Sequence, residues 1–390
     1  MKPKLGKPYC RASRWRPVTR RRACVRLSWS VTSHDTLGAS GGVTACSPPP
    51  AADQPAHLPS ILMLASSDDL ETDLLSAKIV ERGGRVIRVN VEDIPSRVHI
   101  TYTFGEQGSE CKLVEGHLET SLAGVSAAWA PSLGRGPVGL AFDDPPTRPS
   151  ALGGWAGALG DLARSMPCLW VNHPAATQSA SDGLLQIRVA AQVGLEVPRT
   201  VMTNDLTQLR ALGSQCNGEV VARAVGHYRL GPRGHRAYAG GAPSAPEVLC
   251  SAGDERMVPR IYQEHIPERL LLRVFVAGAR VFTSHIPIEY GREPPDLPQS
   301  VSAAEHLLTP EVERQCRLLL QRLGLLFAAV DLALTLDGRH VFLSLDPAPF
   351  WLRIQEQTGQ PISDALVELL IPSDERTSPG SRPGAPPAYG

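Results

Sequence analysis

Two apolar runs near the C-terminus constrain the fold more than any other part of the sequence. They are LLFAAVDLAL (residues 325–334) and HVFLSLD (residues 340–346), with the dipeptide Asp-Gly at 337–338 between them. Such a dipeptide between two strand-like runs is typical of a tight β-turn, so the runs predict an antiparallel hairpin. Each run carries one aspartate, Asp331 or Asp346, and a buried carboxylate needs a partner. We expect the two aspartates to pair across the hairpin, on a sheet that carries a functional site.

Upstream of the hairpin, the chain first shows the pattern of a small α/β domain. SILMLASS (60–67) is an apolar strand, and RVIRVNV (85–91) alternates as a half-buried strand does. An acid-rich helix that ends in two glycines lies between them. A hairpin around 105–108 and the strand GVSAAWAP (124–131) follow. This order predicts an N-terminal α/β domain over residues 60–150.

A second, larger domain of mixed helices and strands is predicted over residues 151–371, which makes the fold class α/β (α+β in detail). Its strand-like runs before the final hairpin are TVMT (200–203), GEVVARAV (218–225), RIYQEHI (260–266) and the hairpin LLLRVFVAGARVFTSHI (270–286). Alternation of apolar and polar residues and the Ala-Gly turn of the hairpin support these strands.

Three segments of this second domain have the spacing of amphipathic helices. One covers 179–194 and places Leu184, Ile187 and Ala191 on one face. A second covers 310–324 and begins with a proline. The last is PISDALVELL (361–370). The apolar stripe of the second helix consists of Val312, Cys316, Leu319, Leu320 and Leu323.

The two ends of the chain differ from this middle part. Residues 1–59 start with a basic stretch and continue with sequence rich in Ser, Gly and Pro, which predicts a disordered extension or a wrongly assigned start. Arg26, His34 and Asp35 interrupt the apolar segment that an export signal needs. The composition of residues 372–390 predicts a disordered tail.

Composition excludes several classes of protein. The 390 residues carry a formal net charge of +0, so nothing favours a nucleic-acid or membrane partner. No apolar run reaches the roughly 18 residues that a membrane helix needs. The 8 cysteines form no CxxC pair and no Cys/His ligand spacing, which favours reduced thiols in the cytoplasm over a zinc site. Lys112 is the last lysine, so the rest of the chain cannot use a lysine mechanism.

Polar residues follow apolar runs on several predicted strands of the second domain. They are Arg223, the pair Gln263-Glu264, Arg273, Asp331 and Asp346. A single arginine or aspartate at a strand end is more often solvated or structurally paired than functional. Two arginines and two carboxylates on one sheet, however, suit a polyphosphate held through Mg²⁺, because guanidinium groups bind phosphate oxygens and carboxylates are hard oxygen ligands.

Three longer blocks resemble a known family. They are WVNHPAATQSASDGLLQIRVAAQVGLEVPRTVMTND (170–205), RIYQEHIPERLLLRVFVAG (260–278) and FAAVDLALTLDGRHVFLSLDPAPFWLRIQEQTGQPISDALVELL (327–370). The blocks are similar to segments of the ATP-grasp ribosomal peptide maturases, the ligases that cross-link microviridin-type (graspetide) peptides. The likeness extends over about residues 60–371 and implies an ATP-grasp fold preceded by a small α/β domain.

The resemblance implies a nucleotide site on the second domain. In the family's pattern, Gln263, Glu264 and the backbone to Ile266 form the hinge strand that binds adenine. Arg223 stands at the strand position that contacts the α-phosphate, and Arg273 contacts phosphate. The implied cofactors are ATP and Mg²⁺.

The resemblance also implies a reaction. Asp331 and Asp346 are the implied metal ligands, and Arg273 and Arg292 the implied catalytic residues, with Arg292 facing the phosphates or the acyl intermediate. The γ-phosphoryl group passes to a carboxylate, and a hydroxyl or amine then attacks the acyl phosphate to form an ester or amide. The implied partners are a precursor peptide, or a small carboxylate and amine. The usual state of related ligases is a homodimer.

The sequence departs from the family's pattern at four places. The lysine after the aspartate of the first helix is replaced by Gly183, and the strand lysine by Arg223. The Glu-x-Asn of the metal strand is here Ser344-Leu345-Asp346. Trp129 is followed by Ala-Pro instead of an arginine pair. A serine hydroxyl is a poorer Mg²⁺ ligand than a carboxylate, so we expect at least one of the two metal positions to weaken.

Three alternatives to an active peptide ligase follow from these residues. The first is a catalytically weakened ATP-grasp protein that binds nucleotide or peptide without turnover. The second, from another class, is a purely structural or interaction protein that binds no nucleotide. The third is a dipeptide or glutamate ligase, since one fold serves many ligases.

Overall fold

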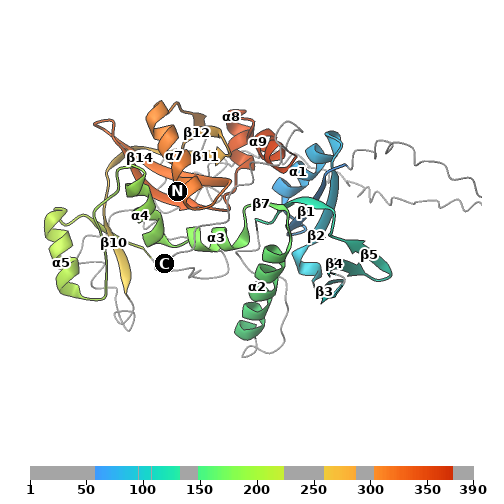
Figure 1. Ribbon diagram of the computed structural model, residues 1–390. Coiled ribbons are helices and arrows are strands. Elements are labelled where there is room, and N and C mark those ends of the chain that lie inside the picture. The colour runs from blue at the N-terminus through green and yellow to red at the C-terminus, as the bar shows by residue number, and fades with distance from the viewer. Residues whose placement is uncertain are drawn as a thin grey trace, which may run out of the picture. The chain divides into compact units, whose positions relative to one another are not determined.

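The computed structural model describes residues 58–94, 96–106, 108–131, 148–223, 259–286 and 303–371, which belong to one unit, residues 56–390 (Figure 1). Helices and strands are mixed throughout, as the predicted α/β class requires. The predicted extension up to residue 57, the predicted tail 372–390 and Arg292 lie outside the described residues. Within the described ranges, no helix is long and apolar enough to cross a membrane.

The N-terminal part contains a parallel sheet in the order β2-β1-β6-β7. Its strands are β1 (Ser60–Ala65), β2 (Arg85–Asn90), β6 (Val125–Trp129) and β7 (Leu169–Val171). Residues 61–65 of β1 are all buried, because a central parallel strand is covered on both faces. The short strand β7 comes from beyond residue 150, so this sheet uses residues on both sides of the predicted domain boundary.

A second, antiparallel sheet of the N-terminal part has the order β3-β4-β5. Its strands are β3 (Val98–Gly105), β4 (Gly108–Glu115) and β5 (Leu118–Ser121). The hairpin β3–β4 is the one that the sequence predicts around 105–108, and Gly108 has a positive φ of 108° there. Helix α1 (Leu70–Glu81) begins at Asp69, whose carboxylate accepts a hydrogen bond from Thr72 N.

The C-terminal part holds two antiparallel sheets. The smaller has the order β8-β10-β9 and consists of β8 (Thr200–Thr203), β9 (Val220–Arg223) and β10 (Arg260–Glu264). The larger has the order β13-β12-β11-β14-β15. Its strands are β11 (Glu268–Ala277), β12 (Arg280–Ile286), β13 (Ala304–Glu305), β14 (Phe327–Thr335) and β15 (His340–Asp346). The pair β14–β15 is the predicted final hairpin.

Helices cover the two faces of the five-stranded sheet. The remaining helices are α2 (Arg148–Ser165), α3 (Pro174–Ala180), α4 (Gly183–Gln192), α5 (Leu206–Gln215), α7 (Pro310–Arg322), α8 (Leu352–Thr358) and α9 (Ile362–Leu370). On one face, α4 and α7 pack against the even-numbered residues of β11 and β14. Cys316, Leu319 and Leu320 are buried there, so the predicted apolar stripe of α7 is confirmed.

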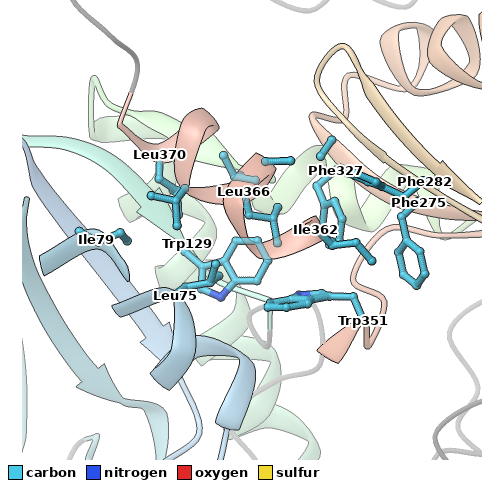
Figure 2. Close-up of a cluster of buried hydrophobic side chains, with 14 of the residues drawn as sticks. Leu75, Ile79, Trp129, Phe275, Phe282, Phe327, Trp351, Ile362, Leu366 and Leu370 are labelled. Atoms are coloured by element: carbon cyan, nitrogen blue, oxygen red, sulfur yellow. The ribbon is translucent and has the colours of Figure 1, made fainter. Parts of the chain in front are cut away.

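The opposite face of this sheet shares one apolar core with the N-terminal part. Trp129 of β6 packs against Phe327 of β14, with ring centroids 6.1 Å apart. Figure 2 shows Ile362 and Leu366 of α9 beside these rings, and both are fully buried. Burying such side chains stabilises the fold by about 1.5–3 kcal/mol each. The common core fixes one face of the strands that carry the candidate site.

Candidate functional site

Four polar residues form a row across four neighbouring strands of the larger sheet. Arg273 of β11 lies opposite Ser284 of β12 on one side and opposite Asp331 of β14 on the other. Asp331 in turn lies opposite Ser344 of β15. Directly opposite residues share a face of the sheet. All four are buried, with at most 7% of the surface of any of them exposed, so the row is a polar feature inside the protein.

Arg273 lies between the two predicted metal ligands. Its Nε atom is 3.6 Å from Asp331 Oδ1, and its Nη2 atom is 3.5 Å from Asp346 Oδ2. The Arg273 side chain is only 6% exposed, whereas that of Asp346 is 23% exposed. Charges buried to this degree are retained only when opposite charges compensate them. The structure therefore brings together Arg273, Asp331 and Asp346, three of the residues predicted from the sequence.

The serine of the metal strand is hydrogen-bonded to one of these carboxylates. Ser344 Oγ donates to Asp331 Oδ2 over 3.1 Å. Asp346 Oδ1 accepts from the backbone N of Ala348 over 3.0 Å, which fixes its carboxylate at the turn after β15. One oxygen of each aspartate thus has a short-range donor, and the other oxygen faces the guanidinium group.

The register of the hairpin differs from the expected pairing of the two aspartates. Asp331 lies opposite Ser344, and Asp346 lies opposite Ala329. A register shift between Asp331 and Leu332 adjusts the pairing of the two strands, and its position cannot be read from apolar periodicity. The two carboxylates are connected through Arg273 on the neighbouring strand instead of facing each other directly.

The predicted hinge strand is β10. The side chain of Gln263 is buried and donates from Nε2 to Thr200 Oγ1 over 3.1 Å. The carboxylate of Glu264 accepts from Arg199 N over 3.3 Å, and Ile266 follows directly after the strand in the sequence. The backbone of Arg223 on β9 pairs with Ile261, but the side chain of Arg223 lies outside what the structure describes.

Helix α4 connects this smaller sheet to the metal strand. A Cβ atom built on Gly183 would lie 3.4 Å from Ile261 Cδ1, an ordinary contact. One turn later, Gln186 Nε2 donates to the carbonyl of Leu345 over 2.8 Å, and Leu345 N donates to Gln186 Oε1 over 3.1 Å. Gln186 is buried and holds the residue between Ser344 and Asp346. The sequence reasoning missed it.

Asn172 is a second positioning residue that the sequence reasoning missed. It is buried and follows β7. Its Nδ2 atom donates to the carbonyls of Phe327 and Pro347, and its Oδ1 atom accepts from Leu326 N and Phe327 N. One side chain thus joins the start of β14 to the turn after β15. A polar residue directly after the apolar run LWV was the only signal available in the sequence.

The oxygen atoms at the site suit a hard cation that needs only a few ligands from the protein. Asp331 Oδ1 is buried and accepts no hydrogen bond from the residues that the structure describes, so it can take a ligand. Asp346 Oδ2 lies beside the same guanidinium group. Among these described residues no group of three or more His, Cys, Asp or Glu side chains could hold a metal ion. Mg²⁺ fits such a site, because it takes one or two carboxylates and completes its shell with phosphate oxygens and water.

Comparison with known proteins places this geometry in a known fold. Residues 60–136 match the family model of the MvdD pre-ATP grasp domain. No curated protein matches the chain. Among solved structures, the macrocyclase MdnB from Microcystis aeruginosa MRC is 26% identical, with a TM-score of 0.67 over 81% of this chain and 100% of that one.

Two further solved structures contain peptide or nucleotide. The macrocyclase MdnC of the same organism, bound with the precursor peptide MdnA, is 22% identical, with a TM-score of 0.68 over 80% of this chain and 100% of that one. The ATP-grasp ligase PsnB, complexed with a variant of its minimal precursor, Mg and ADP, is 19% identical, with a TM-score of 0.60 over 80% of this chain and 97% of that one.

The fold class expected from the sequence, an ATP-grasp fold preceded by a small α/β domain, is therefore confirmed. An MvdD-type pre-ATP-grasp domain matches within the predicted N-terminal domain, and the fold of the whole described chain is that of the ATP-grasp ligases. The chain has an ATP-grasp fold and resembles the ribosomal peptide maturases of the microviridin (graspetide) type.

Proposed function

We propose that this protein is an ATP-dependent carboxylate–amine or carboxylate–alcohol ligase that modifies a ribosomally made peptide through an acyl phosphate. The observation that carries the proposal is the placement of Arg273 between Asp331 and Asp346, inside a row of buried polar residues. Stability alone does not favour such a buried ion cluster, because apolar residues of similar volume do as well or better. Clusters of this kind are concentrated at functional sites.

The nucleotide binds along two strands in this proposal. The backbone from Gln263 to Ile266 binds adenine, while the side chains of Gln263 and Glu264 hold β10 against its neighbours. Arg223 and Arg273 bind the phosphates, since guanidinium groups match phosphate oxygens in geometry and charge. Asp331 and Asp346 hold Mg²⁺, which supplies charge neutralisation at the phosphates.

The chemistry asks mainly for positioning. An oxygen of the substrate carboxylate attacks the γ-phosphorus of ATP, and the bond between that phosphorus and the β,γ-bridging oxygen breaks, so ADP leaves. A hydroxyl or amine then attacks the acyl carbon, loses its proton and displaces inorganic phosphate. Arg273 and Arg292 neutralise the negative charge that the phosphoryl group carries during transfer. Phosphoryl transfer needs little covalent help from the protein, so binding and charge carry the catalysis.

Release of ADP in the presence of a candidate precursor peptide tests this proposal. The candidate peptide is any product of a short open reading frame found beside the gene, and mass spectrometry follows the loss of one water for each bond formed. We expect ADP release that requires both Mg²⁺ and peptide in the wild type, and no release from Asp346→Ala. Asp364→Ala is the matched control, because Asp364 pairs with Lys78 and Arg82 on the surface of α9. Equal turnover by wild type and Asp346→Ala contradicts the proposed site.

A nucleotide-binding protein without turnover is the second candidate. It is favoured by Gly183, Arg223 and Ser344, which stand where the ribosomal peptide maturases have two lysines and a glutamate. Gly183 has room for a Cβ atom, which would lie 3.4 Å from Ile261 Cδ1, an ordinary contact. If the wild type binds ATP without turnover, the triple variant Gly183→Lys, Arg223→Lys, Ser344→Glu should recover ADP release. A triple variant that binds ATP and stays inactive argues against this second reading.

A further inference from the structure

The position opposite Asp331 decides how many cations the site can hold. That position is Ser344, which is fully buried and donates its hydroxyl proton to Asp331 Oδ2 over 3.1 Å. A hydroxyl group engaged in this way orients the carboxylate and adds no negative charge. Two cations side by side need a carboxylate that both can share. In the part of the chain that the structure describes, no third acidic, histidine or cysteine side chain completes such a group with Asp331 and Asp346.

Arg273 already supplies one positive charge at this place. Its guanidinium group faces both aspartates, at 3.6 Å from Asp331 Oδ1 and 3.5 Å from Asp346 Oδ2. Among the residues that the structure describes, the cluster therefore holds one cationic and two anionic side chains. One divalent cation at Asp331 Oδ1 and Asp346 Oδ2 offsets the charge of both carboxylates. A second divalent cation would share the same two carboxylates and would be repelled by the first cation and by the guanidinium group of Arg273.

We infer that the site binds a single divalent cation, with the guanidinium group of Arg273 in the role of a second one and the Ser344 hydroxyl as a positioning group for Asp331. This inference rests on the proposed function, because it concerns the cation that accompanies the nucleotide. It assigns different roles to two neighbouring positions of one strand. Asp346 is a ligand, and Ser344 acts through Asp331.

The number of bound Mn²⁺ ions per nucleotide complex tests the inference without any turnover. The full chain is mixed with the non-hydrolysable analogue AMPPNP and titrated with Mn²⁺, and electron paramagnetic resonance counts the bound ions. We expect one Mn²⁺ per protein–AMPPNP complex, with the spectrum of an isolated ion. Two Mn²⁺ ions per complex with a spin-coupled spectrum overturn the inference and leave the proposed ligase function standing. Absence of AMPPNP binding overturns both.

Substitutions at Ser344 separate its positioning role from direct ligation. Ser344→Ala keeps one Mn²⁺ per complex and weakens its binding roughly tenfold, the usual effect of losing a group that orients a ligand. Ser363→Ala is the matched control, because Ser363 is also fully buried and its hydroxyl makes no hydrogen bond in the described part of the chain. Unchanged Mn²⁺ affinity in Ser344→Ala contradicts the positioning role.

Ser344→Glu provides the opposite change. A glutamate there restores a shared carboxylate, and we expect a second Mn²⁺ with spin coupling to the first. Ser344 is fully buried, so the melting temperature of this variant is measured first. If the variant does not fold, the count in the wild type still decides the inference. A folded Ser344→Glu protein that binds AMPPNP with only one Mn²⁺ overturns the claim that the residue at 344 sets the number of cations.

Discussion

Gln186 gives a sharp test of how the metal strand is held in place. The strand β15 is an edge of the larger sheet, so its outer backbone groups need partners from outside the sheet. Gln186 supplies them for Leu345, accepting from its N–H over 3.1 Å and donating to its carbonyl over 2.8 Å. The same amide donates to the carbonyl of Ala180 over 2.7 Å. A single buried side chain therefore makes three hydrogen bonds to backbone.

The cost of losing these bonds follows from their number. Replacement Gln186→Leu keeps the side chain apolar and similar in size, and it leaves one N–H and two carbonyl groups without this amide. A buried hydrogen bond contributes about 1 kcal/mol net, so we expect a loss of roughly 3 kcal/mol in the free energy of unfolding. Two of the three lost hydrogen bonds hold Leu345, between Ser344 and Asp346, so Mn²⁺ binding to the AMPPNP complex should weaken as well.

Urea denaturation, followed by tryptophan fluorescence, measures this loss. The control is Gln192→Leu, the same substitution at an exposed position of the same helix α4. We expect the control to stay within about 0.5 kcal/mol of the wild type, as exposed substitutions usually do. The reasoning is refuted if Gln186→Leu unfolds at the same urea concentration and with the same slope as Gln192→Leu.

Two further predictions concern the cores on the two faces of the larger sheet. Glu71 of α1 accepts hydrogen bonds from the backbone N of Trp351 and Leu352 at the start of α8. Glu71→Ala should lower the free energy of unfolding by about 2 kcal/mol, as the loss of hydrogen bonds to a charged group does. The urea midpoint measures this loss, and Glu81→Ala, at an exposed position of the same helix, is the control. Burial raises the pKa of the Cys316 thiol to about 12, so this thiol stays protonated at about pH 8 and should react with iodoacetamide only on unfolding; mass spectrometry of the native protein that shows rapid alkylation of Cys316 would refute this.

The long elements of the fold could be predicted from the sequence because their signals are local. The hairpins turn at glycines that have positive φ, such as Gly278 and Gly338, and their strands alternate clearly. The amphipathic stripe of α7 is buried as expected. Sequence reasoning missed α2, whose run RPSALGGWAGALGDLARS contains glycines that weaken any helical signal. It also missed the short elements β7 and α8, which have too few residues for a periodic pattern.

The site could be predicted only as far as residue types allow. Arginine and aspartate on apolar strands indicated the cluster of Arg273, Asp331 and Asp346, which the structure brings together. The polar residues that hold these strands could not be found in this way. The spacing of α4 predicted Ala191 on the buried face, but Ala191 is exposed and Gln186 is buried, because tertiary hydrogen bonds to β15 outweigh apolar periodicity.

Nucleotide binding at the aspartate cluster is the central claim, and thermal unfolding with AMPPNP and Mg²⁺ tests it most directly. A ligand at a hundred times its dissociation constant stabilises the native state by about 2.7 kcal/mol, which gives a readily measured rise in melting temperature. We predict this rise for the wild type with both components present, and a smaller rise for Asp346→Ala, because the side chain of Asp346 is partly exposed and its removal leaves no large buried cavity. A melting temperature of the wild type that AMPPNP and Mg²⁺ leave unchanged contradicts the claim.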